Sequence, residues 1–249
     1  MVEMVVQEEL FYILMYKISI LVYMTYFYLY IFLLLSFIII VSYWTTINTT
    51  VESFNSDKQT FILLGDSILK NDAYVGDGKS IDSLLIERTN GKTISLAIDH
   101  SKIVDIFSQI NEIPSNTNNN LTTVFLSAGG NDILSYYVDN NGDITDANPL
   151  TPMFATYKKL VKAIKTKVPQ ANIVLLDIYY PENMTYKQYH NIIGEWNNML
   201  YNYYKNKDTE VYDVLKISTI LTKQEDFTLG IEPSAEGGAK LVGEMLANY

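Results

Sequence analysis

The sequence contains no cysteine, and this absence excludes several kinds of structure and chemistry. Without thiols the chain can form no disulfide, use no thiolate nucleophile and offer no cysteine ligand to zinc. Positive charge is also scarce, because 18 lysines and arginines face 28 aspartates and glutamates, a formal net charge of −10. A nucleic-acid-binding surface needs excess positive charge to neutralise phosphates. Nucleic acid is therefore not an expected partner.

Residue clusters that would hold a metal or a phosphate are missing as well. No group of histidines and acids has metal-ligand spacing, and no glycine-rich loop resembles a phosphate cradle. The sequence therefore predicts neither a metal nor a cofactor. About 200 of the 249 residues follow an unusual first segment, enough for one sizeable globular domain.

Charged residues are absent from 18–44, which reads ISILVYMTYFYLYIFLLLSFIIIVSYW. A helix of roughly 20 apolar residues crosses a bilayer, and a single run can satisfy its own backbone in lipid only as a helix. Its tyrosines and Trp44 suit the membrane interface. The alternatives are a buried core helix or a cleaved signal peptide, whose apolar region is usually only about 7–15 residues. We therefore expect a membrane anchor at 1–45, then a polar linker at 46–58.

The charges that flank this run give a weak signal for its orientation. Lys17 is the only positively charged residue before the run. Because cytoplasmic flanks of membrane helices are enriched in lysine and arginine, Lys17 favours an inside N-terminus. The sequence thus predicts a single-pass membrane protein whose soluble part is extracytoplasmic.

After the linker, short apolar runs alternate with longer amphipathic segments. Continuous apolar runs suit strands that are covered on both faces, and apolar residues at three- and four-residue spacing suit helices. Strands are predicted at 60–67, 92–99, 121–130, 171–180 and 209–214, and helices at 80–89, 101–110, 151–167, 185–207 and 234–249. This alternation predicts an α/β domain over 59–249, with helices on both faces of a central parallel five-stranded sheet and right-handed crossovers.

Three polar stretches follow the first three predicted strands. They are Gly65-Asp66-Ser67, Asp99-His100-Ser101 and Gly129-Gly130-Asn131-Asp132. Because ligands of open α/β sheets bind outside the carboxyl ends of the strands, these stretches should converge on one rim. Ser67 would then lie near a helix N-terminus, whose dipole favours an oxyanion, and Asn131 could offer an amide donor.

Four motifs occur in order and at suitable spacing: GDSILKNDAYV at 65–75, SLAIDHSKIVDIFSQI at 95–110, LSAGGNDIL at 126–134 and IEPSAEGG at 231–238. With them, residues 60–249 resemble an SGNH (GDSL-type) hydrolase. The resemblance implies a flavodoxin-like three-layer α/β/α sandwich that hydrolyses esters.

The resemblance also implies roles for individual residues. Ser67 matches the nucleophile, and Asn131 matches the amide donor of the oxyanion hole. His100 stands where the family usually has a glycine whose backbone N–H completes that hole. Asp66 and Gly130 flank these groups and are the expected substrate-binding residues, and Asp66 should also orient the turn through hydrogen bonds.

The C-terminal motif departs from the family pattern, which is Asp-x-x-His-Pro. Glu232 stands in the place of the histidine, Leu229 stands in the place of the aspartate, and the nearest upstream acid is Asp226. This arrangement resembles a variant subgroup with an Asp six residues before Glu-Pro-Ser. Glu232 and Asp226 are therefore the expected catalytic partners of Ser67. Burial can raise a carboxyl pKa enough for it to act as a base; His100 is the other candidate base.

Two functions follow from these expectations. The first is a membrane-anchored serine hydrolase that cleaves a carboxylic ester, an acyl or acetyl group on a lipid or glycan, through an acyl-enzyme on Ser67. The second is a catalytically inactive SGNH fold that binds a glycan or a protein partner. The missing histidine favours the second function, whereas the retained Ser67 and Asn131 favour the first.

Overall fold

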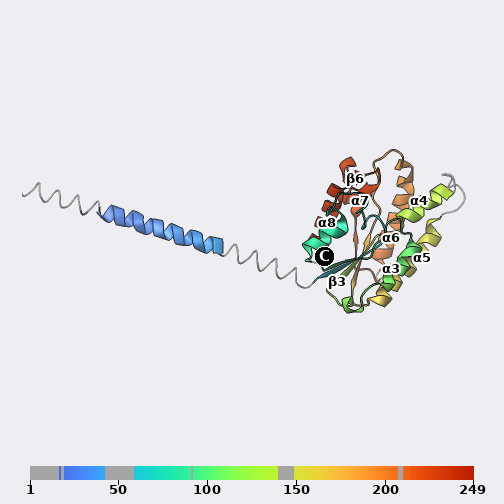
Figure 1. Cartoon of the computed structure of the whole chain (residues 1–249), viewed down its shortest axis with the longest axis horizontal. Helices are drawn as coiled ribbons and strands as arrows, with labels where there is room; N and C mark the ends of the chain where they lie inside the picture. Colours follow the sequence, from blue (N-terminus) through green and yellow to red (C-terminus); the bar gives the residue numbers. More distant parts are fainter. Residues whose placement is uncertain (1–16, 18–19, 43–58, 91, 140–148, 207–209) are drawn as a thin grey trace, which may run out of the picture. The chain divides into compact units, whose positions relative to one another are not determined.

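A computed structural model describes residues 17, 20–42, 59–90, 92–139, 149–206 and 210–249 (Figure 1). The chain divides into two compact units, Met1–Asp57 and Lys58–Tyr249, and each is considered by itself. The predicted linker at 46–58 lies outside the described residues.

The first unit contains a single described helix, Ile20–Ser42, with a mean hydropathy of 2.3 in its most apolar window. At 1.5 Å per residue its 23 residues are about 34 Å long, enough for a bilayer core of roughly 30 Å. Its polar side chains bond within the helix: the Thr25 hydroxyl donates to Leu21 O and the Ser36 hydroxyl to Phe32 O, both at 2.8 Å. The helix can thus cross a membrane by length and composition, a property that a signal sequence shares.

The second unit is built on a parallel five-stranded sheet with the strand order β2-β1-β3-β4-β5. The strands are β1 Thr60–Leu64, β2 Thr93–Ser95, β3 Thr122–Leu126, β4 Asn172–Leu176 and β5 Asp213–Leu215. Successive side chains of β1 face opposite sides of the sheet, and both sides are buried against helices. This explains the unbroken apolar runs of the sequence.

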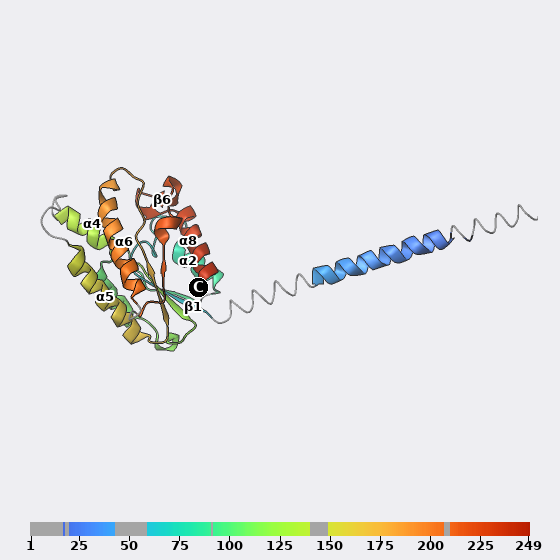
Figure 2. The same ribbon diagram turned by 180° about the vertical axis from the view of Figure 1, so that it is seen from behind.

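Helices cover both faces of the sheet and make a three-layer sandwich, seen from opposite sides in Figures 1 and 2. One face packs against α3 Ile103–Asn111, α4 Gly130–Asp139, α5 Leu150–Lys167 and α6 His190–Lys205. The other face packs against α2 Ile81–Arg88, α7 Ile217–Ile220 and α8 Ala235–Asn248. Short 3-10 turns lie at Ser115–Thr117, Lys187–Tyr189 and Gln224–Asp226. The predicted α/β/α architecture and its five-stranded parallel sheet are confirmed.

The structure differs from the expected elements in several places, and two of them concern the site. The third apolar run was predicted as a strand over 121–130, but β3 ends at Leu126 and α4 begins at Gly130. A small antiparallel hairpin, β6 Phe227–Thr228 and β7 Glu232–Pro233, precedes α8 and was not expected. Both differences bear on the site, because α4 carries Asn131 and β7 carries Glu232.

Candidate active site

The turn after β1 fixes the position of Ser67. Gly65 has a φ of +140°, and a Cβ atom at this position would lie 2.1 Å from the carbonyl oxygen of Ser127, so only glycine fits. The buried Gln109 side chain holds the same residue, because it accepts from the Gly65 N–H and donates to the Gly65 carbonyl, both at 2.8 Å. Ser67 is 6% exposed. The chain thus presents a serine hydroxyl on a rigid turn at the carboxyl edge of the sheet.

The buried Asp66 side chain stabilises this turn through hydrogen bonds. Its Oδ1 accepts from the Ser127 hydroxyl at 2.7 Å and from the Ile68 N–H at 3.2 Å. Burial raises the pKa of Asp66 to about 7, and the negative charge of Glu232 adds to that rise. The predicted substrate-binding residues Asp66 and Gly130 both line the pocket that contains Ser67. The contacts of the Asp66 carboxyl support its role in orienting the turn.

Two residues were expected to supply donors to an oxyanion; Asn131 lines the Ser67 pocket, whereas His100 is not among the described residues that line it. Asn131 lies in the first turn of α4, and its amide donates to Ser101 O at 3.1 Å, which leaves the second N–H of that amide for a ligand. His100 has a φ of +60°, the left-handed conformation that glycine adopts most readily. Within the described ranges, the backbone N–H of His100 has no hydrogen-bond acceptor.

The His100 side chain points largely into solvent. It is 79% exposed, and its Nε2 lies 3.5 Å from Asp99 Oδ2. The Tyr74 hydroxyl donates to the same oxygen at 2.5 Å. The His100 imidazole therefore has an acid beside it, but it lacks the burial that would fix its position.

Glu232 is the carboxylate that the structure brings to Ser67. Burial raises the pKa of Glu232, a hydrogen bond from the Ser67 hydroxyl opposes that rise, and the negative charge of Asp99 adds to it. The Oε2 atom of Glu232 is buried and has no hydrogen-bond partner among the described residues. The base and the nucleophile proposed from the sequence therefore line the same pocket, where Glu232 is partly buried.

Asp226 occupies a different place. Its carboxylate accepts from the backbone N–H groups of Thr222 and Lys223, both at 3.0 Å, and pairs with the Lys240 ammonium at 2.5 Å. Burial would raise the pKa of Asp226, but these hydrogen bonds lower it below its ordinary value. Asp226 does not belong to the described residues that line the Ser67 pocket. Its contacts support a structural role beneath the hairpin.

A pocket with a cavity volume of about 60 Å³ opens beside Ser67 and Glu232. Its walls are mainly apolar and aromatic, and they are contributed by the ends of β3 and β4, by α4 and by the segment before α6. Lining side chains include Ile133, Leu134, Ile178, Tyr179, Tyr186, Tyr189, Ile193 and Ile231. In the described part of the chain, no group of three or more His, Cys, Asp or Glu residues could hold a metal ion.

Sequence reasoning missed several residues that shape the site, Gln109 among them. It lies 44 residues from Gly65 along the chain, and its amide is specified only by the backbone that it meets in the fold. The hairpin that carries Glu232 left a faint signal, the Leu229-Gly230 pair between two short runs. Both residues have positive φ, +49° and +86°, as a type I′ hairpin turn requires.

No protein-family model matches the chain, and no curated protein matches it. Solved structures do match. A member of the lipolytic protein G-D-S-L family from Veillonella parvula superposes with a TM-score of 0.59 at 16% identity, over 77% of this chain and 98% of its own. A lipase from a goat rumen metagenome superposes with a TM-score of 0.58 at 15% identity, over 76% of this chain and 96% of its own. The second unit therefore has the fold of the G-D-S-L lipolytic proteins.

Proposed function

We propose that this chain is a membrane-anchored serine hydrolase of the SGNH type, which cleaves a carboxylic ester through an acyl-enzyme on Ser67. The observation that carries the proposal is that Ser67 and the partly buried Glu232 carboxylate line the same pocket, where burial raises the pKa of Glu232. A serine hydroxyl is a weak nucleophile until a neighbouring base takes its proton. Asn131 and the His100 backbone N–H supply donors on the same rim.

The reaction follows from these positions. Ser67 Oγ attacks the ester carbonyl carbon while Glu232 takes the hydroxyl proton. The carbonyl electron pair moves to its oxygen, which the Asn131 amide and the His100 N–H stabilise. Collapse of this intermediate breaks the bond to the alcohol, which leaves with the proton from Glu232. Water, activated by Glu232, then cleaves the acyl-enzyme, and the acid leaves as Ser67 regains its proton.

The lining of the pocket indicates which part of the ester it would bind. Its apolar and aromatic walls suit an acyl chain of several carbons, because such walls gain free energy by excluding water from apolar surface. We therefore favour an acyl ester over an acetylated glycan as the substrate.

The test uses the full chain in detergent with a fluorophosphonate probe and p-nitrophenyl esters of increasing acyl length. The wild type should be labelled and turn over esters, whereas Ser67→Ala should do neither while keeping its circular dichroism spectrum. Its loss of stability should stay within about 1–2 kcal/mol, because the change removes a single buried hydroxyl. Equal turnover in both proteins would remove Ser67 from the mechanism. A wild-type protein that is not labelled by the probe and does not hydrolyse the esters would instead favour the binding-protein alternative.

A further inference from the structure

Glu232 lies between two residues whose backbone carbonyls are each held by a buried side chain from elsewhere in the fold. The Tyr179 hydroxyl donates to the carbonyl of Ile231, and the Asn71 amide donates to the carbonyl of Pro233 at 3.0 Å. Tyr179 is 3% exposed and Asn71 is fully buried. The backbone of the proposed base is therefore held immediately before and immediately after its own position.

Tyr179 reaches the hairpin from the carboxyl end of β4. Its ring packs on Phe227 of β6 with 4.9 Å between ring centroids, and it also lines the pocket beside Ser67. Burial raises the pKa of Tyr179 well above its ordinary value, and the negative charges of Glu232 and Asp66 add to that rise. The phenol therefore stays protonated at any working pH and acts as a hydrogen-bond donor.

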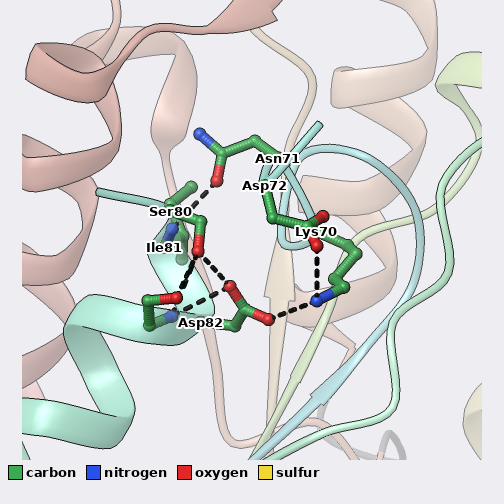
Figure 3. Close-up of polar contacts among 7 residues, drawn as sticks. Lys70, Asn71, Asp72, Ser80, Ile81 and Asp82 are labelled. Carbon is green, nitrogen blue, oxygen red and sulfur yellow. Dashed lines mark hydrogen bonds and ion pairs between the residues drawn. The ribbon is translucent and has the colours of Figure 1, made fainter. Parts of the chain in front are cut away.

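Asn71 reaches the hairpin from the nucleophile side, four residues after Ser67. Its Oδ1 accepts from the Ile81 N–H at 2.9 Å, at the start of α2. Figure 3 shows this side chain directed at the backbone of Ile81, beside the ion pair of Lys70 and Asp82 at 2.7 Å. One amide thus ties the segment after Ser67 to α2 and to the strand that carries Glu232.

The hairpin needs this support, because β6 and β7 contain only two residues each. An isolated two-stranded hairpin is marginally stable at best in water. A catalytic group misplaced by about 1 Å can cost about 10²-fold in rate. We propose that Tyr179 and Asn71 are positioning residues that together hold Glu232 against Ser67, an inference that rests on the proposed function.

The first test measures whether the two residues act through Glu232. Tyr179→Phe and Asn71→Ala are made in the full chain, alone and combined with Glu232→Gln. Each single variant should lower kcat by about 10- to 100-fold with little change in KM. In the Glu232→Gln background neither should lower the residual rate further, because no base remains to be positioned. Full additive losses in that background would overturn the proposal.

Tyr249→Phe is the matched control, because it removes a hydroxyl that donates to Asp213 at 2.7 Å beside β5. It should keep the wild-type kcat. If Tyr179→Phe lowers only the melting temperature, as the control does, the Tyr179 contact is structural and the proposal fails.

A second measurement does not depend on turnover. The Glu232 carboxyl is titrated by carbon NMR of the full chain labelled at its glutamate side chains, with Glu232→Gln to assign the signal. Loss of either contact should let water reach Glu232, so its pKa should fall toward the ordinary glutamate value, while Tyr249→Phe leaves it unchanged. An unchanged pKa in both positioning variants would sink the proposal, whether or not the wild type hydrolyses esters. Failure of the proposed function would appear separately, as a wild type without turnover.

Discussion

A carboxylate takes the proton of a serine hydroxyl efficiently only when its own pKa lies near the working pH. An ordinary glutamate, with a pKa of about 4.3, is too weak a base. Burial and the neighbouring charge of Asp99 raise the pKa of Glu232, which fits the base role that we propose for this carboxylate in place of the absent histidine. The His100 imidazole, in contrast, is 79% exposed to solvent.

The pH dependence of catalysis should therefore report Glu232. Its raised pKa means that Glu232 becomes protonated, and unable to accept a proton, as the pH falls through a value above the ordinary 4.5. kcat should decline on that acid limb, and Glu232→Gln should lower it by about 10²–10⁴ and abolish the limb. Initial rates measured across a pH series for both proteins provide the check.

His100→Gln is the companion variant to this experiment. It keeps the backbone N–H that we propose as an oxyanion donor and removes only the imidazole, so it should change kcat far less than Glu232→Gln. The reverse order of effects would make His100 the base. If neither variant matters while Ser67→Ala is inactive, a water or Asp226 would become the next candidate.

Asn131 can be tested by a single substitution in the same way. Asn131→Ala removes the proposed amide donor to the oxyanion and should lower kcat by about 10²–10³. Because the same amide holds Ser101 O at 3.1 Å, the melting temperature is measured alongside the rate. A loss of rate explained entirely by unfolding would assign Asn131 to the fold alone.

At the scale of elements, the β6–β7 hairpin explains the departure from the family motif. The position of the usual aspartate is taken by Leu229, which is 74% exposed at the tip of the hairpin. Asp226 lies at the base of the hairpin instead, and its backbone carbonyl accepts from the Ser234 N–H at 2.8 Å. An acid that the sequence suggested for catalysis thus joins the hairpin to α8 through Lys240.

Asp226→Asn should consequently affect stability more than chemistry. The variant replaces a charged acceptor of three hydrogen bonds, so the melting temperature should fall by on the order of 5–10 °C while kcat of the folded protein changes little. Because the pKa of Asp226 is lowered in the fold, its contribution is present above the ordinary carboxyl pKa and disappears as the pH falls through the folded value. The melting temperatures of the two proteins should therefore differ at neutral pH and become equal at acidic pH. A large loss of kcat without a change in melting temperature would restore Asp226 to the mechanism.

The pattern of apolar runs predicted the sheet because parallel strands covered on both faces leave a strong local signal. The same signal overestimated the third strand, since Ala128, Gly129 and Gly130 continue an apolar run whose backbone has already turned toward α4. Ile133 and Tyr137 are four residues apart and both are buried. This helical spacing indicates α4, which was not predicted.

The residues of the candidate site also differ in whether the sequence predicts them. Ser67, Asn131 and Glu232 lie in short motifs that can be recognised locally, whereas Gln109, Tyr179 and Asn71 act on backbone far away in the sequence. Asn71 and Pro233 are 162 positions apart. Contacts of this kind depend on the assembled fold, and a single sequence carries no local pattern for them.

At the scale of the whole molecule, the two units differ in the solvent that their surfaces require. Among the described residues of the first unit, no apolar side chain of the helix Ile20–Ser42 is buried, whereas the second unit encloses its core on both faces of its sheet. Exposed apolar surface of that extent is stable only in lipid or detergent. Membrane association should therefore reside in the first unit.

Removal of residues 1–50 tests this division. The truncated chain keeps every strand of the sheet and should elute as a soluble monomer in gel filtration, with a helical circular dichroism signal and the same kcat as the full chain in detergent. The full chain should stay in the membrane fraction after an alkaline wash, and its intact mass should retain the apolar helix, because an anchor is not cleaved. Recovery of a soluble product without that helix from cells expressing the full chain would identify a signal peptide instead. Aggregation of the truncated chain would show that the second unit does not fold by itself.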